Sequence, residues 1–256
     1  MLAGGAFVAY GLRRTLSPLS ARPATVVAID GRFTRRASLL ELGGLLAGAL
    51  GAAGWRIRDS EGAGPAGIAS GAVSCVLTPE QTEGPYYIAR EKLRRRITEG
   101  RPGTPLTLRT RVVDASTCKP IKGAAVDVWH CDAGGAYSGL GAGSGSRTFM
   151  RGIQKTDAKG LAVFDTIYPG WYPGRTVHIH VKVHLGGRVV HTGQLYFPDA
   201  VTDAAYRRKP YSSRPGRDTR NADDSVFRNG GKRSMLALRK TRSGYAASIA
   251  MGVSRS

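Results

Sequence analysis

Residues 177–184 read Val-His-Ile-His-Val-Lys-Val-His and form the sharpest local pattern in the chain. In a β-strand successive side chains point to opposite faces, so its valines and isoleucine share one face and its histidines and lysine share the other. Such alternation predicts a strand that packs one face into a core. On the polar face His178 and His180 lie about 7 Å apart at Cα, whereas His184 lies about 13 Å beyond His180. Both nearer imidazoles can therefore reach one metal ion.

The sequence on both sides of this stretch also consists of short apolar runs separated by turn residues. The 35 glycines and 13 prolines favour many short strands joined by tight turns over long helices. We predict further strands over residues 106–114, 124–130, 161–167, 188–197, 235–239 and 245–253. The pattern indicates an all-β protein, a β-sandwich of mostly antiparallel strands with long loops.

Turn residues indicate how these strands connect. Lys119-Pro120 lies between the strands at 106–114 and 124–130, which we expect to pair as an antiparallel hairpin. A second hairpin is expected around Asp157–Gly160, because the glycine can adopt the positive φ that such a turn often needs. The last two predicted strands are expected to form a closing hairpin.

The amino-terminal residues have the pattern of an export signal. Arg35 and Arg36 stand just before an apolar, glycine-rich stretch at 39–53, which is typical of the twin-arginine pathway. This run is shorter than the roughly 20 residues that a membrane-spanning helix needs. We therefore expect a leader over 1–55, a flexible Gly/Ala/Ser-rich linker over 56–74 and a folded domain over 75–256.

The signal predicts an exported protein, periplasmic or extracellular, that uses the twin-arginine translocation machinery as a partner. No clear cleavage site follows the apolar run, so a retained membrane anchor and the position of the true start codon are left open.

The charge distribution argues against a nucleic-acid partner, and the cysteine spacing argues against a thiolate metal site. The formal net charge is +20, but the basic residues form no aromatic-interleaved stripe and no groove-reading motif, so we expect no nucleic-acid partner. Cys75, Cys118 and Cys131 form no CxxC pair, which argues against a thiolate metal site. One disulfide and one free thiol fit an oxidising compartment, and the sequence leaves the pairing open.

Two tyrosines can complete a metal site beside the histidines. On its own, a His-x-His pair on a strand is also the pattern of two solvated histidines. Here Tyr172 and Arg175 lie in a Pro/Gly-rich loop just upstream, and Tyr137 ends another loop after a predicted strand. Phenolate is a hard anionic oxygen donor, so two imidazoles and two phenolates favour ferric iron over zinc or magnesium.

Three motifs resemble the intradiol ring-cleavage dioxygenases, the family of protocatechuate and catechol dioxygenases. They are the stretch from Gly123 to Ser138 with Val-Asp-Val-Trp-His at its centre, the stretch Tyr172-Pro-Gly-Arg-Thr-Val-His-Ile-His180, and Gly193-Gln-Leu-Tyr-Phe-Pro198. In motif order the resemblance covers residues 75–254.

The resemblance implies a role for each matching residue. Tyr137, Tyr172, His178 and His180 match the family's iron ligands, and Tyr172 matches the tyrosine that leaves when substrate binds. Arg175 matches a catalytic arginine beside the reacting ring, and Gln194 matches a glutamine that lines the substrate pocket. Tyr168 is a rival for the place of Tyr172, but we prefer Tyr172 for its family Tyr-Pro context and expect Tyr168 to be a packed aromatic at a strand end.

The resemblance also implies the reaction. A non-haem Fe(III) enzyme would cleave the bond between the two hydroxyl-bearing carbons of a catechol-type ring with O2 and give a cis,cis-muconate-type diacid. One alternative is a secreted β-sandwich binding module without catalysis. Another is a zinc hydrolase at the histidines, which lacks a nearby Cys, Asp or Glu. The catechol derivative and any homo-oligomer are left open.

Overall fold

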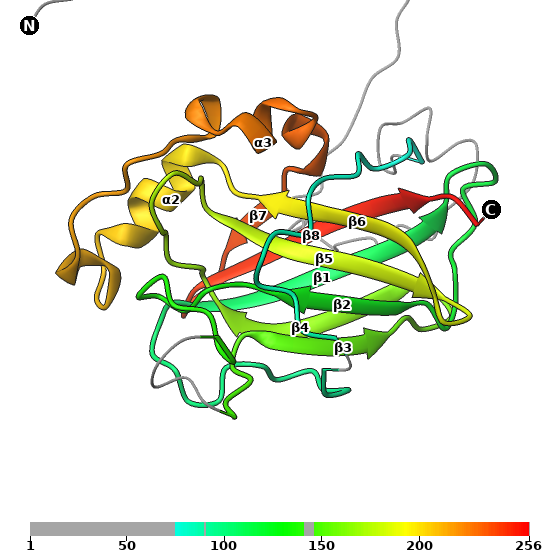
Figure 1. Cartoon of the computed structure of the whole chain (residues 1–256), viewed down its shortest axis with the longest axis horizontal. Coiled ribbons are helices and arrows are strands. Elements are labelled where there is room, and N and C mark those ends of the chain that lie inside the picture. Colours follow the sequence, from blue (N-terminus) through cyan, green and yellow to red (C-terminus); the bar gives the residue numbers. More distant parts are fainter. Residues whose placement is uncertain (1–74, 90, 141–145, 256) are drawn as a thin grey trace, which may run out of the picture. The chain divides into compact units, whose positions relative to one another are not determined.

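A computed structural model of the chain describes residues 75–89, 91–140 and 146–255. These residues contain eight strands in two four-stranded sheets, which Figure 1 shows one over the other. The expected β-sandwich of mostly antiparallel strands is confirmed. The expected leader and linker lie outside the described residues.

The first sheet has the strand order β4-β1-β8-β7. Its strands are β4 (Leu161–Ile167), β1 (Pro105–Asp114), β8 (Tyr245–Val253) and β7 (Ala237–Lys240). β1 runs antiparallel to β4 and parallel to β8, while β7 and β8 form the expected closing hairpin.

The second sheet has the strand order β3-β2-β5-β6 and is antiparallel throughout. Its strands are β3 (Arg151–Lys155), β2 (Ala125–Trp129), β5 (His178–Leu185) and β6 (Arg188–Tyr196). β5 therefore lies in the interior of the sheet, between β2 and β6.

The inner faces of the two sheets form one core. From β5 it takes Ile179, Val181 and Val183, which are fully buried, as the alternation predicts. Facing strands contribute residues such as Leu108 in β1 and Phe164 in β4. Burying a side chain of this size stabilises the fold by about 1.5–3 kcal/mol, so reversing the faces of β5 would be costly.

The predicted hairpin between 106–114 and 124–130 is wrong. β1 pairs with β4 and β8, whereas β2 pairs with β3 and β5, so the two strands belong to different sheets. The chain turns after β1, where Asp114 Oδ1 accepts hydrogen bonds from the backbone of Ser116 and Thr117, and then crosses to the other layer. Both strands have an apolar face, and stacking those faces buries them more completely than pairing the strands edge to edge.

The turn at Asp157–Gly160 forms as predicted, with Gly160 at φ +71°, but it is not a hairpin. The strands on its two sides, β3 and β4, again lie in different sheets.

Short helices fill the connection between β6 and β7, and the sequence pattern did not predict them. They are α2 (Asp199–Tyr206), η1 (Tyr211–Ser213), η2 (Asn221–Asp223), α3 (Ser225–Arg228) and η3 (Gly231–Ser234). Figure 1 shows α2 and α3 on the same side of the strands. No helix in the described part of the chain is long and apolar enough to cross a membrane.

A disulfide joins Cys75 to Cys118, and Cys131 is a buried free thiol. The bond connects the first described residue to the turn that follows β1. The pairing that the sequence left open is thereby assigned.

Replacing Cys75 with serine is expected to lower the free energy of unfolding by about 2–4 kcal/mol, because the disulfide closes a long loop in the unfolded chain. Its two cysteines are 43 positions apart. Denaturant unfolding under oxidising conditions measures the loss, and dithiothreitol should destabilise the wild type but not the variant. Equal stability of the two oxidised proteins would contradict the expectation.

Candidate functional site

The polar face of β5 carries a compact aromatic cluster. Trp129 of β2 stacks on His180, with ring centroids 4.9 Å apart and an interplanar angle of 6°. The Tyr137 ring, from the loop after β2, lies 6.2 Å from the His180 ring. The Tyr172 ring, from the loop before β5, lies 5.7 Å from the His178 ring. Two loops therefore bring phenols onto the strand that carries the histidines.

The four predicted metal ligands come together in this cluster. His178 Nε2 lies 3.1 Å from His180 Nε2 and 3.0 Å from the Tyr172 hydroxyl. The Tyr137 ring lies 5.7 Å from the Tyr172 ring. Tyr137, His178 and His180 are buried, with 6%, 2% and 1% of their surfaces exposed. The four side chains therefore lie in one mostly buried cluster.

The histidines are suited to ligation because both are neutral, and His178 is also oriented by a hydrogen bond. His178 Nδ1 lies 2.6 Å from the Thr176 carbonyl oxygen, which accepts its hydrogen and leaves the Nε2 lone pair facing the site. Burial, and next the Arg175 charge, lowers the pKa of His178 to about 3. Burial, followed by the neighbouring His178, lowers the pKa of His180 well below its ordinary value.

The phenols restrict which cation the site can hold. Burial raises the pKa of Tyr172 to about 12 and raises that of Tyr137 well above its ordinary value. The Tyr137 hydroxyl is buried and has no hydrogen-bond partner among the described residues. A cation of high charge is needed to ionise both phenols at neutral pH. The donor set therefore fits ferric iron.

Phenol oxygens are essential to that fit. Over the described residues, no three His, Cys, Asp or Glu side chains gather into a group that could hold a metal ion. Two imidazoles alone fall short of the usual zinc set, so the zinc hydrolase alternative gains no support.

Arg175 and Gln194 lie together beside His180. Gln194 of β6 stands directly opposite His180 in the ladder between β5 and β6 and is fully buried. Its side-chain oxygen accepts a hydrogen bond from Arg175 Nη2 at 2.5 Å, and its amide nitrogen donates to the Thr82 carbonyl at 3.0 Å. Both residues therefore lie at the edge of the four-residue cluster.

Tyr168, His130 and His184 are not part of the cluster. Tyr168 belongs to the main core, where its hydroxyl pairs with Thr202 Oγ1 at 2.8 Å, so it is a packed aromatic. His130 is buried and pairs through Nε2 with Thr166 Oγ1 at 2.8 Å. His184 is partly exposed near the far end of β5.

Two residues outside the set of predicted site residues hold the phenol-bearing loops. Tyr86 stacks on Tyr137, with centroids 4.2 Å apart. Arg151, only 1% exposed, donates to the Tyr86 carbonyl at 2.7 Å, to Ser138 Oγ at 3.0 Å and to the Ser138 carbonyl at 2.8 Å. One guanidinium thus ties the Tyr86 loop to the residue after Tyr137. An arginine at a strand start gives no sequence signal of such a role.

Gly84 permits the loop before Tyr86 to lie close to the site. Its φ is +72°, and a Cβ at this position would lie 3.2 Å from His180 Cε1. A side chain here would be strained in its backbone and would press on the imidazole.

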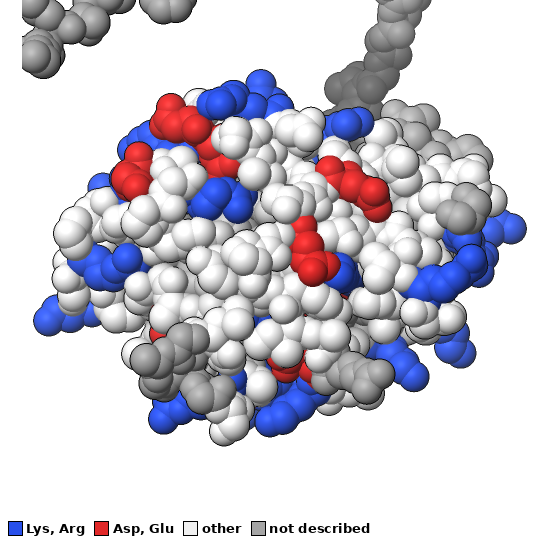
Figure 2. Space-filling view, in the orientation of Figure 1, with Lys and Arg blue, Asp and Glu red and all other residues white. Residues whose placement is uncertain are grey.

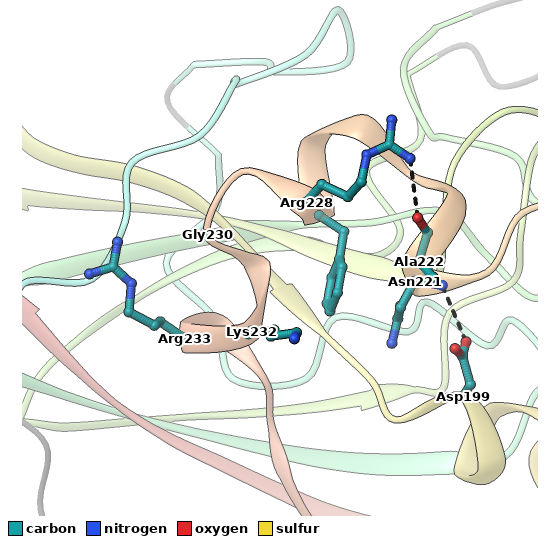
Figure 3. A pocket seen from close by; sticks show the side chains of 8 residues that line it. Asp199, Asn221, Ala222, Arg228, Gly230, Lys232 and Arg233 are labelled. Carbon is teal, nitrogen blue, oxygen red and sulfur yellow. Dashed lines mark hydrogen bonds between the residues drawn. The ribbon is translucent and has the colours of Figure 1, made fainter. Parts of the chain in front are cut away.

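A separate pocket lies outside the cluster. It has a volume of about 710 Å³ and is lined by Asp199, Asn221, Ala222, Phe227, Arg228, Gly230, Lys232 and Arg233 (Figure 3). None of these is a predicted site residue. On the face shown in Figure 2, Lys and Arg side chains form separate groups around the edge, with no continuous basic band.

Comparisons with known proteins agree on one family. A dioxygenase family model matches residues 82–205, which include every predicted site residue. An intradiol ring-cleavage dioxygenase from Tetranychus urticae is 35% identical, with a TM-score of 0.68, over 70% of this chain and 95% of that protein.

Two further relatives have narrower or weaker matches. The dioxygenase domain of a dioxygenase carbohydrate-binding protein fusion from the cellulolytic bacterium Streptomyces sp. SirexAA-E is 36% identical, with a TM-score of 0.54, over 68% of this chain and 96% of that domain. Catechol 1,2-dioxygenase 2 from Acinetobacter lwoffii is 34% identical over 134 residues, which are 50% of this chain and 46% of that enzyme. The chain thus spans about half the length of this curated relative.

Replacing Arg151 with methionine is expected to lower the free energy of unfolding by about 3–5 kcal/mol, because it removes one partner of a buried ion pair. The partner left behind is Glu91, whose carboxylate lies 3.8 Å from Arg151 Nε. Denaturant unfolding measures the change. Arg188, exposed at the start of β6, is the matched control, and its methionine variant should change stability by less than about 0.5 kcal/mol. Similar losses in both variants would contradict this role.

Proposed function

This chain belongs to the intradiol ring-cleavage dioxygenases, and on that premise we propose that its aromatic cluster holds ferric iron and cleaves a catechol-type diol. The proposed ligands are Tyr137, Tyr172, His178 and His180. The single observation that carries the proposal is the convergence of two buried neutral imidazoles, one buried phenol and one half-buried phenol beside a fixed guanidinium.

The proposed reaction consumes one diol and one O2. The bond between the two hydroxyl-bearing carbons breaks, each of these carbons gains one oxygen atom, and the product is a cis,cis-muconate-type diacid. Ferric iron, when bound, supplies the Lewis acidity that ionises the diol and activates its ring toward oxygen. The remaining requirements are proton removal, charge stabilisation and exclusion of water, and side chains of this chain can meet all three.

Tyr172 is placed to remove a proton. Its phenol is the more exposed of the two, and burial raises its pKa to about 12, so its ionised form is a strong base. A diol that displaces the Tyr172 phenolate can transfer a hydroxyl proton to the Tyr172 oxygen. The exchange then brings no net charge into a buried site, where unpaired charge is costly.

Arg175 is placed to stabilise negative charge. Its Nη2 is fixed on Gln194, whose backbone pairs with His180, so the guanidinium stands next to the ligand set. In the cleavage reaction, negative charge develops on a ring carbon as the electrons of the diol move toward oxygen. A cation held beside that carbon lowers the barrier most strongly in a site with little water.

Aromatic side chains exclude water from this site. Tyr86 covers the Tyr137 ring, and Trp129 covers one face of His180. Tyr87 packs on Trp129 in turn, with ring centroids 4.9 Å apart. The enclosure also favours a flat aromatic substrate, which can lie against aromatic walls.

The non-catalytic binding module of the same fold is less well supported. Such a protein has no need to keep four potential metal ligands and a half-buried arginine together at one place.

We also propose that the twin-arginine signal exports the protein, on the basis of Arg35, Arg36 and the apolar stretch that follows them.

The function is tested by the visible spectrum of the purified protein, with iron analysis, before and after anaerobic addition of catechol, protocatechuate or hydroxyquinol. We expect about one iron per chain, a charge-transfer band from tyrosinate bound to iron, and a shift of that band to longer wavelength with at least one diol. Tyr137→Phe should weaken the band and lower turnover by at least tenfold.

Zinc reconstitution is the control, because zinc phenolate does not absorb visible light. An iron-loaded protein that stays colourless and responds to no diol would overturn the ferric site and favour the binding-module alternative.

Export is tested by replacing Arg35 and Arg36 with lysines and separating cytoplasmic from exported material. We expect the variant to accumulate in the cytoplasm. The earlier pair Arg13 and Arg14, which precedes no comparable apolar run, is the matched control and should tolerate the same change. Equal export of both variants would reject the twin-arginine route.

A further inference from the structure

Asp224 contacts the site from a distant part of the chain. It is 49 positions from Arg175, lies beyond the matched residues 82–205, and has a fully buried side chain. Its Oδ2 accepts hydrogen bonds from Arg175 Nε at 2.9 Å and from the Thr176 backbone nitrogen at 2.8 Å. Its Oδ1 accepts from the backbone nitrogens of Val226 and Phe227, at 2.7 and 3.2 Å, and so caps α3.

The two oxygens of Asp224 therefore have different roles: Oδ1 caps α3, and Oδ2 holds Arg175 and the Thr176 backbone. The cap on α3 needs one acceptor oxygen, and serine, threonine or asparagine can provide it. The contact with Arg175 needs a second oxygen that carries negative charge, which only a carboxylate offers. Removal of a carboxylate from water is costly unless donors surround it, and here two donors lie at each oxygen, one side-chain and one backbone at Oδ2 and two backbone at Oδ1.

The guanidinium of Arg175 is thereby fixed at two points. Asp224 holds Nε, and Gln194 holds Nη2. Among the described residues, Nη1 has no acceptor. An arginine side chain otherwise has large rotamer freedom, so two fixed nitrogens determine both the position and the plane of the third.

The segment that carries Asp224 is itself braced. Asn221 accepts a hydrogen bond from Thr176 Oγ1 at 2.7 Å and donates to the Phe197 carbonyl at 2.9 Å. On the outer side, Figure 3 shows Asn221 joined to Asp199 and Arg228 joined to the Ala222 carbonyl. Asp224 thus projects from a support that is tied to the end of β6 and the start of α2.

We propose that Asp224 is a positioning residue for Arg175, and that it sets the orientation in which Nη1 of the guanidinium meets the substrate. This inference rests on the proposed function, because it assigns Arg175 to the reacting ring. It adds a requirement outside the matched family region: α3 must be in place for the arginine to be aligned.

Asp224→Ser tests the proposal, because serine keeps a capping oxygen and removes the charged contact. We expect turnover to fall about 10- to 100-fold with less than about threefold change in KM, since small displacements of a positioned group can cost that much in rate. Iron content and the tyrosinate band of the resting enzyme should match the wild type. Asp223→Ser, the matched control at an exposed neighbour in η2, should leave all three unchanged.

Two further measurements separate positioning from a general structural role. In a double-mutant cycle, Asp224→Ser should add little to the loss caused by Arg175→Gln, because it acts through that arginine. In the metal-free protein, the 15N-labelled Arg175 Nε–H should exchange slowly with solvent, and Asp224→Ser but not Asp223→Ser should make it exchange fast. Arg175→Lys identifies the signal by removing it.

Additive losses in the cycle, wild-type turnover in Asp224→Ser, or unchanged Nε–H exchange would each overturn the proposal. A wild-type protein without activity on any diol would overturn the proposed function instead. The exchange measurement would still report whether Asp224 holds Arg175, since it requires neither iron nor turnover.

Discussion

The site depends on one constraint, the two-sided environment of β5. Ile179, Val181 and Val183 must face the core between the sheets, and the period of a strand then forces His178 and His180 onto the opposite face together. Pairing with β2 on one side and β6 on the other prevents a one-residue slip. Because a slip would expose the apolar residues and bury the histidines in the core, the hydrophobic effect indirectly maintains the spacing of the imidazoles.

The loops around β5 are held by apolar contacts and by buried polar groups. Tyr168 and Trp171 pack the Tyr172 loop against the core, and Ala133 packs the start of the Tyr137 loop. Arg151 and Asp224 add hydrogen bonds, each by joining the backbone of one segment to a side chain or backbone of another. Each of these buried charges depends on all of its partners.

Alternation in the sequence predicts which residues face the core, but it does not predict which strand lies beside which. Strands β1 and β2 have the expected bounds within one or two residues, yet the same pattern suits edge-to-edge pairing and face-to-face stacking equally. The short helices after β6 were missed for a related reason. α3 has four residues, too few for a periodic pattern, and contacts such as the bond from Gln81 to the Val226 carbonyl help to hold it.

The candidate site likewise contains residues that the sequence could predict and residues that it could not. His178 and His180 were predictable because their spacing is local, and Tyr137, Tyr172, Arg175 and Gln194 because each lies in a family motif. Arg151 and Asp224 were not predictable, since their partners Tyr86 and Arg175 are 65 and 49 positions away. Each looks in the sequence like an ordinary surface charge.

The buried thiol of Cys131 has a consequence for how the chain oxidises. Burial raises the pKa of Cys131 to about 12, and its sulfur donates to the Gly170 carbonyl. Thiol exchange proceeds through the thiolate, so this sulfur is almost inert at neutral pH once the sandwich has closed. Cys75 and Cys118 then have only each other as partners. If the chain folds before it is oxidised, non-native disulfides are avoided, because the Cys131 thiol is then already buried.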